Sequence, residues 1–404
     1  MPGRAPARDG ASSQSRRVSD TAPFHWGNRP ADPVDASYLI VPWLLYQHYG
    51  DRRTMAEHYD GLKAWVDCLT TQAEGGLVRY SYWGDWAPPV GEAVSGSIGA
   101  SAVSRDTPGA LMSTGHYLLS ARLLSDMARV LGREADAAAY ADLARRIAAA
   151  YDAAFWDEKA GGYGSNNQAS NALSLALGLV PERRKGRVAE SLVRDVMETH
   201  AGHLATGNLC TKHLLEQLAE HGRADVAWCV ATQETYPSWG YMLAEGATTL
   251  WERWEKATGG GMNSHNHPML GSVSSFFLKY LAGIAVDPLR PAWARFRVRP
   301  HIVGDLAWAS AKLRTVRGPV EAMWQREDDR IVVRLAVPVG STALVSVPKP
   351  TPGGTCRITE GGRAIWPGGA RRAEADGIRD ASDDGTWVRF TVGAGRYEFV
   401  AKGE

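Results

Sequence analysis

The hydrophobic pattern of this chain changes period near residue 287, and this change limits the folds that the chain can adopt. From about residue 34 to residue 283 the apolar residues recur at the spacing of amphipathic helices. After Asp287 apolar and polar residues alternate, as they do in half-buried strands. With 404 residues the chain also exceeds the roughly 250 to 300 that one hydrophobic core can hold. We therefore expect a helical domain over 23–287 and a β-domain over 288–404, joined at the proline-rich stretch 288–291.

The helical part reads as about ten helices arranged in five hairpins, interrupted by segments that carry Gly, Pro, Asn or Asp. The expected pairs are 38–50 with 53–72, 110–132 with 134–156, 168–180 with 183–200, 207–222 with 223–233, and 240–257 with 269–284. Repeated helical hairpins stack as an open solenoid or close into a ring of inner and outer helices. Long polar loops gathered at one end of a closed ring would build a pocket. A closed α/α toroid has six hairpins, so this chain is expected to be one hairpin short.

The second part contains several short segments of alternating pattern, bounded by Gly, Pro and Asp. They cover 295–302, 306–315, 319–327, 330–339, 342–349, 356–362 and 386–402. Short strands at this spacing are typical of an antiparallel β-sandwich. We expect one that occupies the whole of 288–404.

The charge balance points to a neutral ligand. Lys and Arg total 45 against 44 Asp and Glu, which removes the electrostatic basis for binding nucleic acid or an anionic membrane. No run approaches the ~18 apolar residues that span a bilayer. Fifteen tryptophans are many for this length, and their size favours cores or a ligand groove.

The cysteines and the N-terminal residues suggest a cytoplasmic location. Neither a disulfide framework nor a structural metal is indicated, since no CxxC pair and no His at zinc-finger spacing accompany the scattered Cys68, Cys210, Cys229 and Cys356. A reducing compartment is then expected. Residues 1–22 are rich in Arg and Ser, lack the apolar stretch of a secretory signal, and are expected to be disordered.

One segment, 235–273, concentrates the side chains that bind sugars and move protons. It contains three indoles, two carboxylates and two imidazoles: Trp239, Trp251, Trp254, Glu245, Glu252, His265 and His267. Flat indole faces suit the apolar faces of sugar rings, and a carboxylate or a neutral imidazole hydrogen-bonds hydroxyls or handles a proton. We place this segment on one helix and the loop after it, and expect a carbohydrate substrate.

An ordered set of motifs resembles the bacterial α-L-rhamnosidases of glycoside hydrolase family seventy-eight. The matching stretches are SYWGDW (81–86), 203–222, 236–254, 261–273, and WARFRVRPH with GDLAWA (293–309). The resemblance implies an (α/α)6 barrel followed by a C-terminal β-sandwich. It also implies an inverting glycosidase that releases terminal α-L-rhamnose and needs no metal or organic cofactor.

The resemblance also assigns roles to individual residues. Glu252, in LWERW, matches the general base, and His267 matches a sugar-binding histidine. Asp85 and Trp86 match the loop that holds the rhamnose ring. Trp239 and Trp251 would be secondary walls of the same cavity.

Each of these residues also has a structural interpretation. Glu252 would otherwise be a surface carboxylate paired with a basic residue, but flanking tryptophans favour a functional carboxyl with a raised pKa. Glu245 is the alternative base. Asp85 would otherwise cap a turn, because Gly-Asp is common turn chemistry. His265 and His267 would otherwise be hydrogen-bonding residues of a loop.

The family's general acid lies in a signature of the form D-x-x-x-R-x-E-x-x-G-W-x-G-D, and nothing in residues 1–33 resembles it. Two explanations stay open: a fragment of a full-length rhamnosidase, or a non-catalytic carbohydrate-binding remnant that keeps Asp85, Trp86 and His267. Another toroid glycosidase or a polysaccharide lyase is a further alternative. The lyase is disfavoured because no Lys or Arg cluster accompanies the tryptophans.

Overall fold

The computed structural model describes residue 18 and residues 33–90, 106–258, 264–368 and 377–404. The predicted disordered segment 1–22, apart from residue 18, lies outside the described residues. The described residues form two compact units. One comprises those within 1–43, 52–217 and 233–269, and the other those within 44–51, 218–232 and 270–404.

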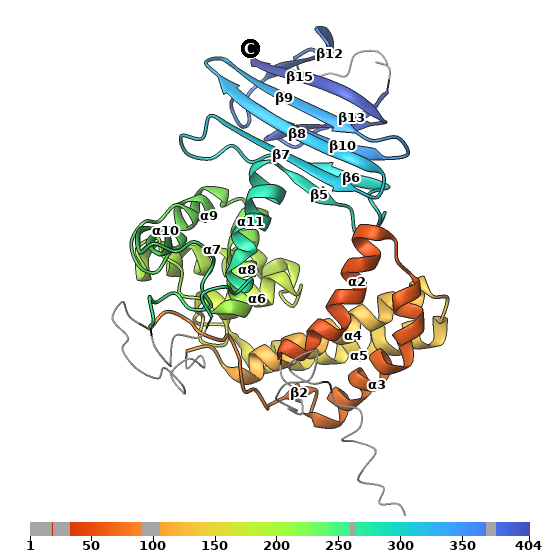
Figure 1. Cartoon of the computed structure of the whole chain (residues 1–404), viewed down its shortest axis with the longest axis vertical. Helices are drawn as coiled ribbons and strands as arrows, with labels where there is room; N and C mark the ends of the chain where they lie inside the picture. Colours follow the sequence, from red (N-terminus) through yellow and green to blue (C-terminus); the bar gives the residue numbers. More distant parts are fainter. Residues whose placement is uncertain (1–17, 19–32, 91–105, 259–263, 369–376) are drawn as a thin grey trace, which may run out of the picture. The chain divides into compact units, whose positions relative to one another are not determined.

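The helices follow the predicted hairpins closely (Figure 1). Each predicted pair has its counterpart: α2 (Ser37–Tyr49) with α3 (Arg53–Gln72), α4 (Gly109–Val130) with α5 (Glu134–Phe155), α6 (Gln168–Ala176) with α7 (Glu182–Arg194), α8 (Asn208–Glu220) with α9 (Ala224–Ala231), and α10 (Trp239–Ala244) with α11 (Val273–Phe276). The π-helical segments η3 (Asp195–Thr199) and η6 (Phe277–Leu281) extend α7 and α11. The 3-10 turns η1 (Pro33–Ala36) and η5 (Met269–Ser272) directly precede α2 and α11. Gly132 makes the predicted turn between α4 and α5 with φ of +74°, a left-handed conformation that glycine adopts without strain.

One predicted helix, 240–257, is wrong over most of its length. α10 ends at Ala244, because Gly246 takes φ of +85° and closes the helix. Its N–H donates to Leu243 O (3.0 Å) and the N–H of Ala247 to Met242 O (2.9 Å), the paired bonds of a Schellman motif. The pattern of apolar residues after Gly246 therefore reflects an irregular segment that buries its tryptophans.

Glu252 lies on this irregular segment. Its backbone is held by pairing with the stretch that contains both imidazoles: Glu252 N–H donates to Ser264 O (2.8 Å) and His267 N–H to Leu250 O (2.9 Å). Two short antiparallel ribbons occur elsewhere in the helical unit, β1 (Ala73–Glu74) with β2 (Leu77–Val78) and β3 (Trp156–Asp157) with β4 (Gly162–Tyr163).

The second part forms two sheets, as predicted, but one pair of strands, Arg295–Val298 with Thr342–Pro348, is parallel in a sandwich that we predicted to be antiparallel. A five-stranded sheet has the order β13-β14-β10-β6-β5 and a six-stranded sheet the order β12-β11-β15-β9-β8-β7. The predicted strands appear as β6 (Arg295–Val298), β7 (Trp308–Thr315), β8 (Gly318–Glu327), β9 (Arg330–Val337), β10 (Thr342–Pro348), β11 (Cys356–Glu360), β14 (Trp387–Val392) and β15 (Gly395–Gly403). Three further strands complete the sheets: β5 (Ile284–Val286), β12 (Arg363–Trp366) and β13 (Ile378–Asp383).

Both sheets share one core. It takes alternate residues of each strand, such as Val320, Ala322 and Trp324 of β8, which are buried while their neighbours are not. Phe390 of one sheet stacks on Phe399 of the other, with ring centroids 5.5 Å apart. β5 pairs antiparallel with β6, so the sheet begins before the boundary that we predicted at residue 287.

Candidate active site

A cavity of about 500 Å³ lies within the helical unit. Its walls come from the start of the described chain, from the loop before α4, from α4 and α8, and from the segments around Glu252 and His267. The lining residues are Pro33, Val34, Ser37, Ile40, Trp83, Trp86, His116, Leu209, Lys212, Glu252, His267 and Met269. Three of the residues singled out from the sequence, Trp86, Glu252 and His267, therefore meet in one place although they are far apart in the chain.

The carboxylate of Glu252 is half-buried and held at both oxygens. The indole N–H of Trp86 donates to Oε1 (3.1 Å), and the backbone N–H of Ser264 donates to Oε2 (2.9 Å). A carboxylate has about four acceptor positions, so these two bonds orient the group and leave acceptor positions unused. The alternative base, Glu245, follows the end of α10, forms an ion pair with Lys256 (2.8 Å), and is not among the residues that line the cavity.

Trp83 and Trp86 form an aromatic wall. Their rings meet edge to face with centroids 4.5 Å apart, and Tyr82 meets Trp83 in the same manner at 4.9 Å. The loop that carries them makes tight turns, with positive φ at Gly84 and at the buried Ala87. Trp83 lines the cavity and belongs to the SYWGDW motif, but the sequence had indicated only Asp85 and Trp86 of this motif as site residues.

Asp85 lies behind this wall and not in the cavity lining. It is 1% exposed, and its oxygens accept from the backbone N–H groups of Gly207 (2.7 Å) and Cys210 (2.9 Å). These donors belong to the first turn of α8, where helices favour a negative charge. Burial raises the pKa of Asp85 to about 6, although the backbone hydrogen bonds work in the other direction. Both carboxylate oxygens of Asp85 bind backbone N–H groups at the start of α8, and Asp85 does not line the cavity. Direct contact of Asp85 with a sugar therefore stays a prediction without support from this geometry.

The backbone beside Asp85 is packed so closely that only glycine fits opposite. A Cβ at Gly207 would lie 2.3 Å from Trp86 O and 2.4 Å from Asp85 O. The N–H of Asn208 donates to Trp86 O (2.7 Å). The start of α8 therefore fixes the main chain of Trp86 directly.

The two imidazoles differ in position. His267 lines the cavity, and its Nδ1 is buried without a hydrogen-bond partner among the described residues. His265 instead stacks on Trp251, with centroids 4.9 Å apart and planes at 21°. Trp251 is buried under this stack and does not line the cavity.

Trp239 and Trp254 belong to the support beneath the site. Trp239 is buried edge to face against Trp254 at 5.2 Å, and the indole N–H of Trp254 donates to Thr206 O (3.0 Å). Trp239 and Trp251 are not among the residues that line this cavity, and both rings pack against other aromatic rings; their role as secondary walls stays a prediction.

Comparison with known proteins agrees with the fold. The model of the bacterial α-L-rhamnosidase 6 hairpin glycosidase domain matches residues 10–281, and that of the bacterial α-L-rhamnosidase C-terminal domain matches 283–358.

The chain belongs to the bacterial α-L-rhamnosidase family.

An α-L-rhamnosidase of Streptomyces avermitilis is 35% identical over 400 residues, which are 96% of this chain and 35% of that protein. The solved α-L-rhamnosidase of Dictyoglumus thermophilum is 37% identical with a TM-score of 0.86, over 96% of this chain and 42% of the other. The Streptomyces avermitilis enzyme in complex with L-rhamnose is 32% identical with a TM-score of 0.81, over 97% and 35%. The chain thus spans well under half the length of these relatives. The predicted family and the predicted order of a six-hairpin helical domain before a β-sandwich are confirmed.

Two polar residues of the cavity were missed in the sequence. His116 lies in the middle of α4, in a regular helical pattern that gives no sign of a site. Lys212 lies in the 203–222 stretch that resembles the family, but the sequence did not indicate it as a site residue. Burial lowers the pKa of His116 to about 4, and the charge of Lys212 adds to this effect. At neutral pH this imidazole is therefore uncharged.

Two general properties were also searched over the described part of the chain. No group of three or more His, Cys, Asp or Glu side chains there could hold a metal ion. None of its helices has the length and apolar character needed to cross a membrane.

Proposed function

We propose that this chain binds terminal α-L-rhamnosyl groups and hydrolyses their glycosidic bond with inversion, using Glu252 as general base. The observation that carries the proposal is the meeting of Glu252, Trp86 and His267 in one cavity. An aromatic wall, an oriented carboxylate and an imidazole with an unused nitrogen are the groups that a deoxy sugar and an attacking water require. The rhamnose complex of the Streptomyces avermitilis relative supports the choice of sugar.

In the proposed reaction Glu252 takes a proton from a water molecule that attacks the anomeric carbon. The bond from that carbon to the leaving oxygen breaks, and the leaving oxygen must receive a proton. Inverting enzymes use a second carboxyl for this step, about 6.5 to 9.5 Å from the first. Glu252 is the only carboxyl among the described residues that line the cavity. Residues 1–33 do not contain the family's acid signature either, so we propose that residues 1–404, acting by themselves, protonate the leaving group poorly.

This proposal predicts a strong dependence on the leaving group. A general acid contributes a factor of about 10² to 10⁴, and it contributes least when the leaving oxygen is already a good leaving group. We therefore expect the chain to hydrolyse 4-nitrophenyl α-L-rhamnoside while an alkyl α-L-rhamnoside is turned over at least about 10²-fold more slowly. The first-formed sugar should be the β-anomer, followed by proton NMR before mutarotation.

The results separate this function from the alternative. Release of 4-nitrophenol with the α-anomer formed first would contradict inversion. Binding of L-rhamnose without turnover of either glycoside would instead support a non-catalytic carbohydrate-binding protein, the second function that the same cavity allows. A lyase would produce an unsaturated sugar that absorbs in the near ultraviolet.

We further propose the cytoplasm as the location and a rhamnosylated small molecule or oligosaccharide as the partner. Buried thiols at Cys68, Cys210 and Cys356 suit a reducing compartment. The near-zero formal net charge of +1 suits an uncharged substrate better than nucleic acid or a membrane surface.

A further inference from the structure

We propose that His116 and Lys212 orient the substrate by binding two neighbouring hydroxyls of the sugar, one as acceptor and the other as donor. This inference rests on the proposed function and concerns a part of the same cavity to which no motif led. In this proposal His116 and Lys212 determine which sugar is bound, whereas Glu252 activates the attacking water.

The two ring nitrogens of His116 have different roles. Its Nδ1 lies 2.8 Å from Met112 O, and a carbonyl oxygen only accepts, so Nδ1 must carry the proton. The neutral ring therefore has a lone pair on Nε2, for which the described residues supply no hydrogen-bond partner. A histidine bonded to the preceding helical turn is commonly a core residue. Here the ring is buried and also lines the cavity, so Nε2 is the ring nitrogen that could accept a hydrogen bond from a bound sugar.

Lys212 supplies the complementary group. It lies on α8, one helical turn after Leu209, and both residues line the cavity. An ammonium has three donors and no acceptor, whereas the imidazole in this tautomer offers only an acceptor. The nearby positive charge of Lys212 also opposes protonation of His116, which keeps the two roles distinct at neutral pH.

A vicinal diol matches such a pair, because each hydroxyl both donates and accepts. Rhamnose has neighbouring hydroxyls on three successive carbons and a methyl group in place of the usual hydroxymethyl. The cavity also has an apolar lining suited to that methyl group, from Val34, Ile40, Leu209 and Met269. The diol is thus expected on the α4 and α8 side, leaving Trp86 and Glu252 for the ring face and the anomeric carbon.

The test is the affinity for L-rhamnose and for its three monodeoxy analogues, measured by titration calorimetry. Hydrogen bonds to charged groups contribute enough that Lys212→Met should weaken rhamnose binding about 10-fold or more, and His116→Asn by about 5-fold or more. For the analogue that lacks the contacted hydroxyl, the variant and the wild type should bind equally, since the contact is already lost. Lys185→Met is the control: this lysine pairs with Glu182 on α7 and should leave every affinity unchanged.

The outcomes separate the two proposals. If the wild type binds rhamnose and Lys212→Met and His116→Asn bind it equally well, the orienting pair is refuted and the proposed function stands. If the wild type does not bind rhamnose, both are refuted. Lys212 is exposed, so its substitution should not disturb folding. Should His116→Asn fail to fold, Lys212→Met decides alone.

Discussion

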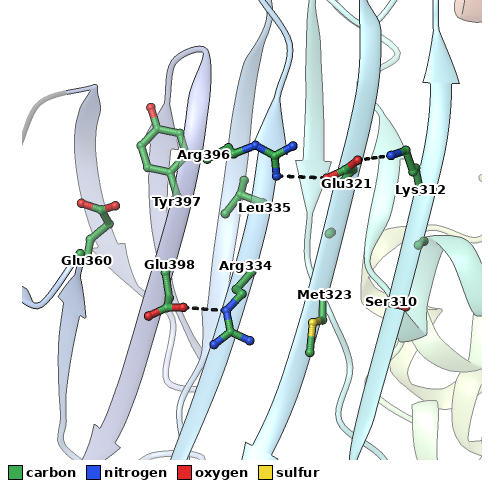
Figure 2. A pocket seen from close by; sticks show the side chains of 13 residues that line it. Ser310, Lys312, Glu321, Met323, Arg334, Leu335, Glu360, Arg396, Tyr397 and Glu398 are labelled. Atoms are coloured by element: carbon green, nitrogen blue, oxygen red, sulfur yellow. Dashed lines mark hydrogen bonds and ion pairs between the residues drawn. The ribbon is translucent and has the colours of Figure 1, made fainter.

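Each unit of this protein has a cavity, and the larger one is the less convincing site. A trough of about 690 Å³ lies along the six-stranded sheet, against about 500 Å³ for the cavity around Glu252. Figure 2 shows that the charges of the trough pair with one another across the strands. Glu321 binds both Lys312 (2.5 Å) and Arg396 (3.3 Å), and Arg334 binds Glu398 (2.6 Å).

The difference arises from the origin of the side chains. In the sheet the register puts Lys312 opposite Glu321 and Arg334 opposite Glu398, so neighbouring strands neutralise each other's charges. The cavity of the helical unit draws its polar groups from separate loops and helices. There His116 Nε2 and His267 Nδ1 have no partner among the described residues. Unused polar atoms beside aromatic rings therefore identify a site better than volume does.

The largest expected effect contrasts one carboxylate from each cavity. Glu252→Gln should lower the release of 4-nitrophenol by a factor of about 10² or more, because the amide cannot accept the proton of the water. Glu398→Gln, in the trough, should leave the rate unchanged. Initial rates at saturating substrate check both. Equal rates for Glu252→Gln and the wild type would remove the distinction between the two cavities.

The next contrast concerns two fully buried tryptophans that each donate to a backbone carbonyl. Trp254 binds Thr206 O, and Trp324 in the sandwich binds Leu281 O (2.7 Å). Replacing either with Ala should lower the free energy of unfolding by about 3 to 5 kcal/mol, measured by urea denaturation. Only Trp254→Ala should also weaken rhamnose binding, since Trp254 lies two residues from Glu252. A loss of affinity in Trp324→Ala would argue against this separation.

Asp85 offers a comparison between a buried carboxylate and a partly exposed one. Asp85→Asn replaces an acceptor of two backbone N–H groups by an amide, which should cost about 1 to 3 kcal/mol of stability. It should also weaken rhamnose binding through Trp86. Glu321→Gln, which loses only ion pairs with the exposed Lys312 and Arg396, should cost less stability than Asp85→Asn. Thermal unfolding followed by circular dichroism measures both, and equal losses would contradict the structural role given to Asp85.

The smallest effect is a pH dependence shared by one histidine in each unit. Burial lowers the pKa of both His116 and His301 to about 4, below the usual 6.5. Between these values the unfolded chain binds more protons than the folded one, so stability falls as the pH drops from about 6.5 to about 4. The loss should be roughly 1 kcal/mol per pH unit for each histidine. Asp85, with its pKa raised to about 6, acts in the opposite direction below that pH.

Urea unfolding between pH 4.5 and 7.5 tests this dependence. His116→Asn and His301→Asn should each flatten the profile, while the exposed His58→Asn should leave it unchanged. A profile of unchanged slope in both buried variants would show that other groups govern the acid response.

The sequence was a good guide wherever local pattern decides structure. The period of the apolar residues predicted both members of most hairpins, and alternation predicted seven segments, the last of which forms the two strands β14 and β15. It failed after Ala244, where Trp251 and Trp254 keep helical spacing although Gly246 ends the helix. Buried aromatic residues have the same spacing in an irregular segment as in a helix, so periodicity alone could not separate the two.

For the site, the sequence by itself singled out Trp86, Glu252 and His267 from motif and residue type, and these three residues line one cavity. Only the tertiary structure decided that Asp85 serves α8, that Trp239 and Trp251 are packing residues, and that His116 and Lys212 line the cavity. The physical reason is the range of the interactions. Helix and strand patterns depend on near neighbours, whereas the direction of a side chain at a cavity depends on elements more than a hundred residues away in the chain.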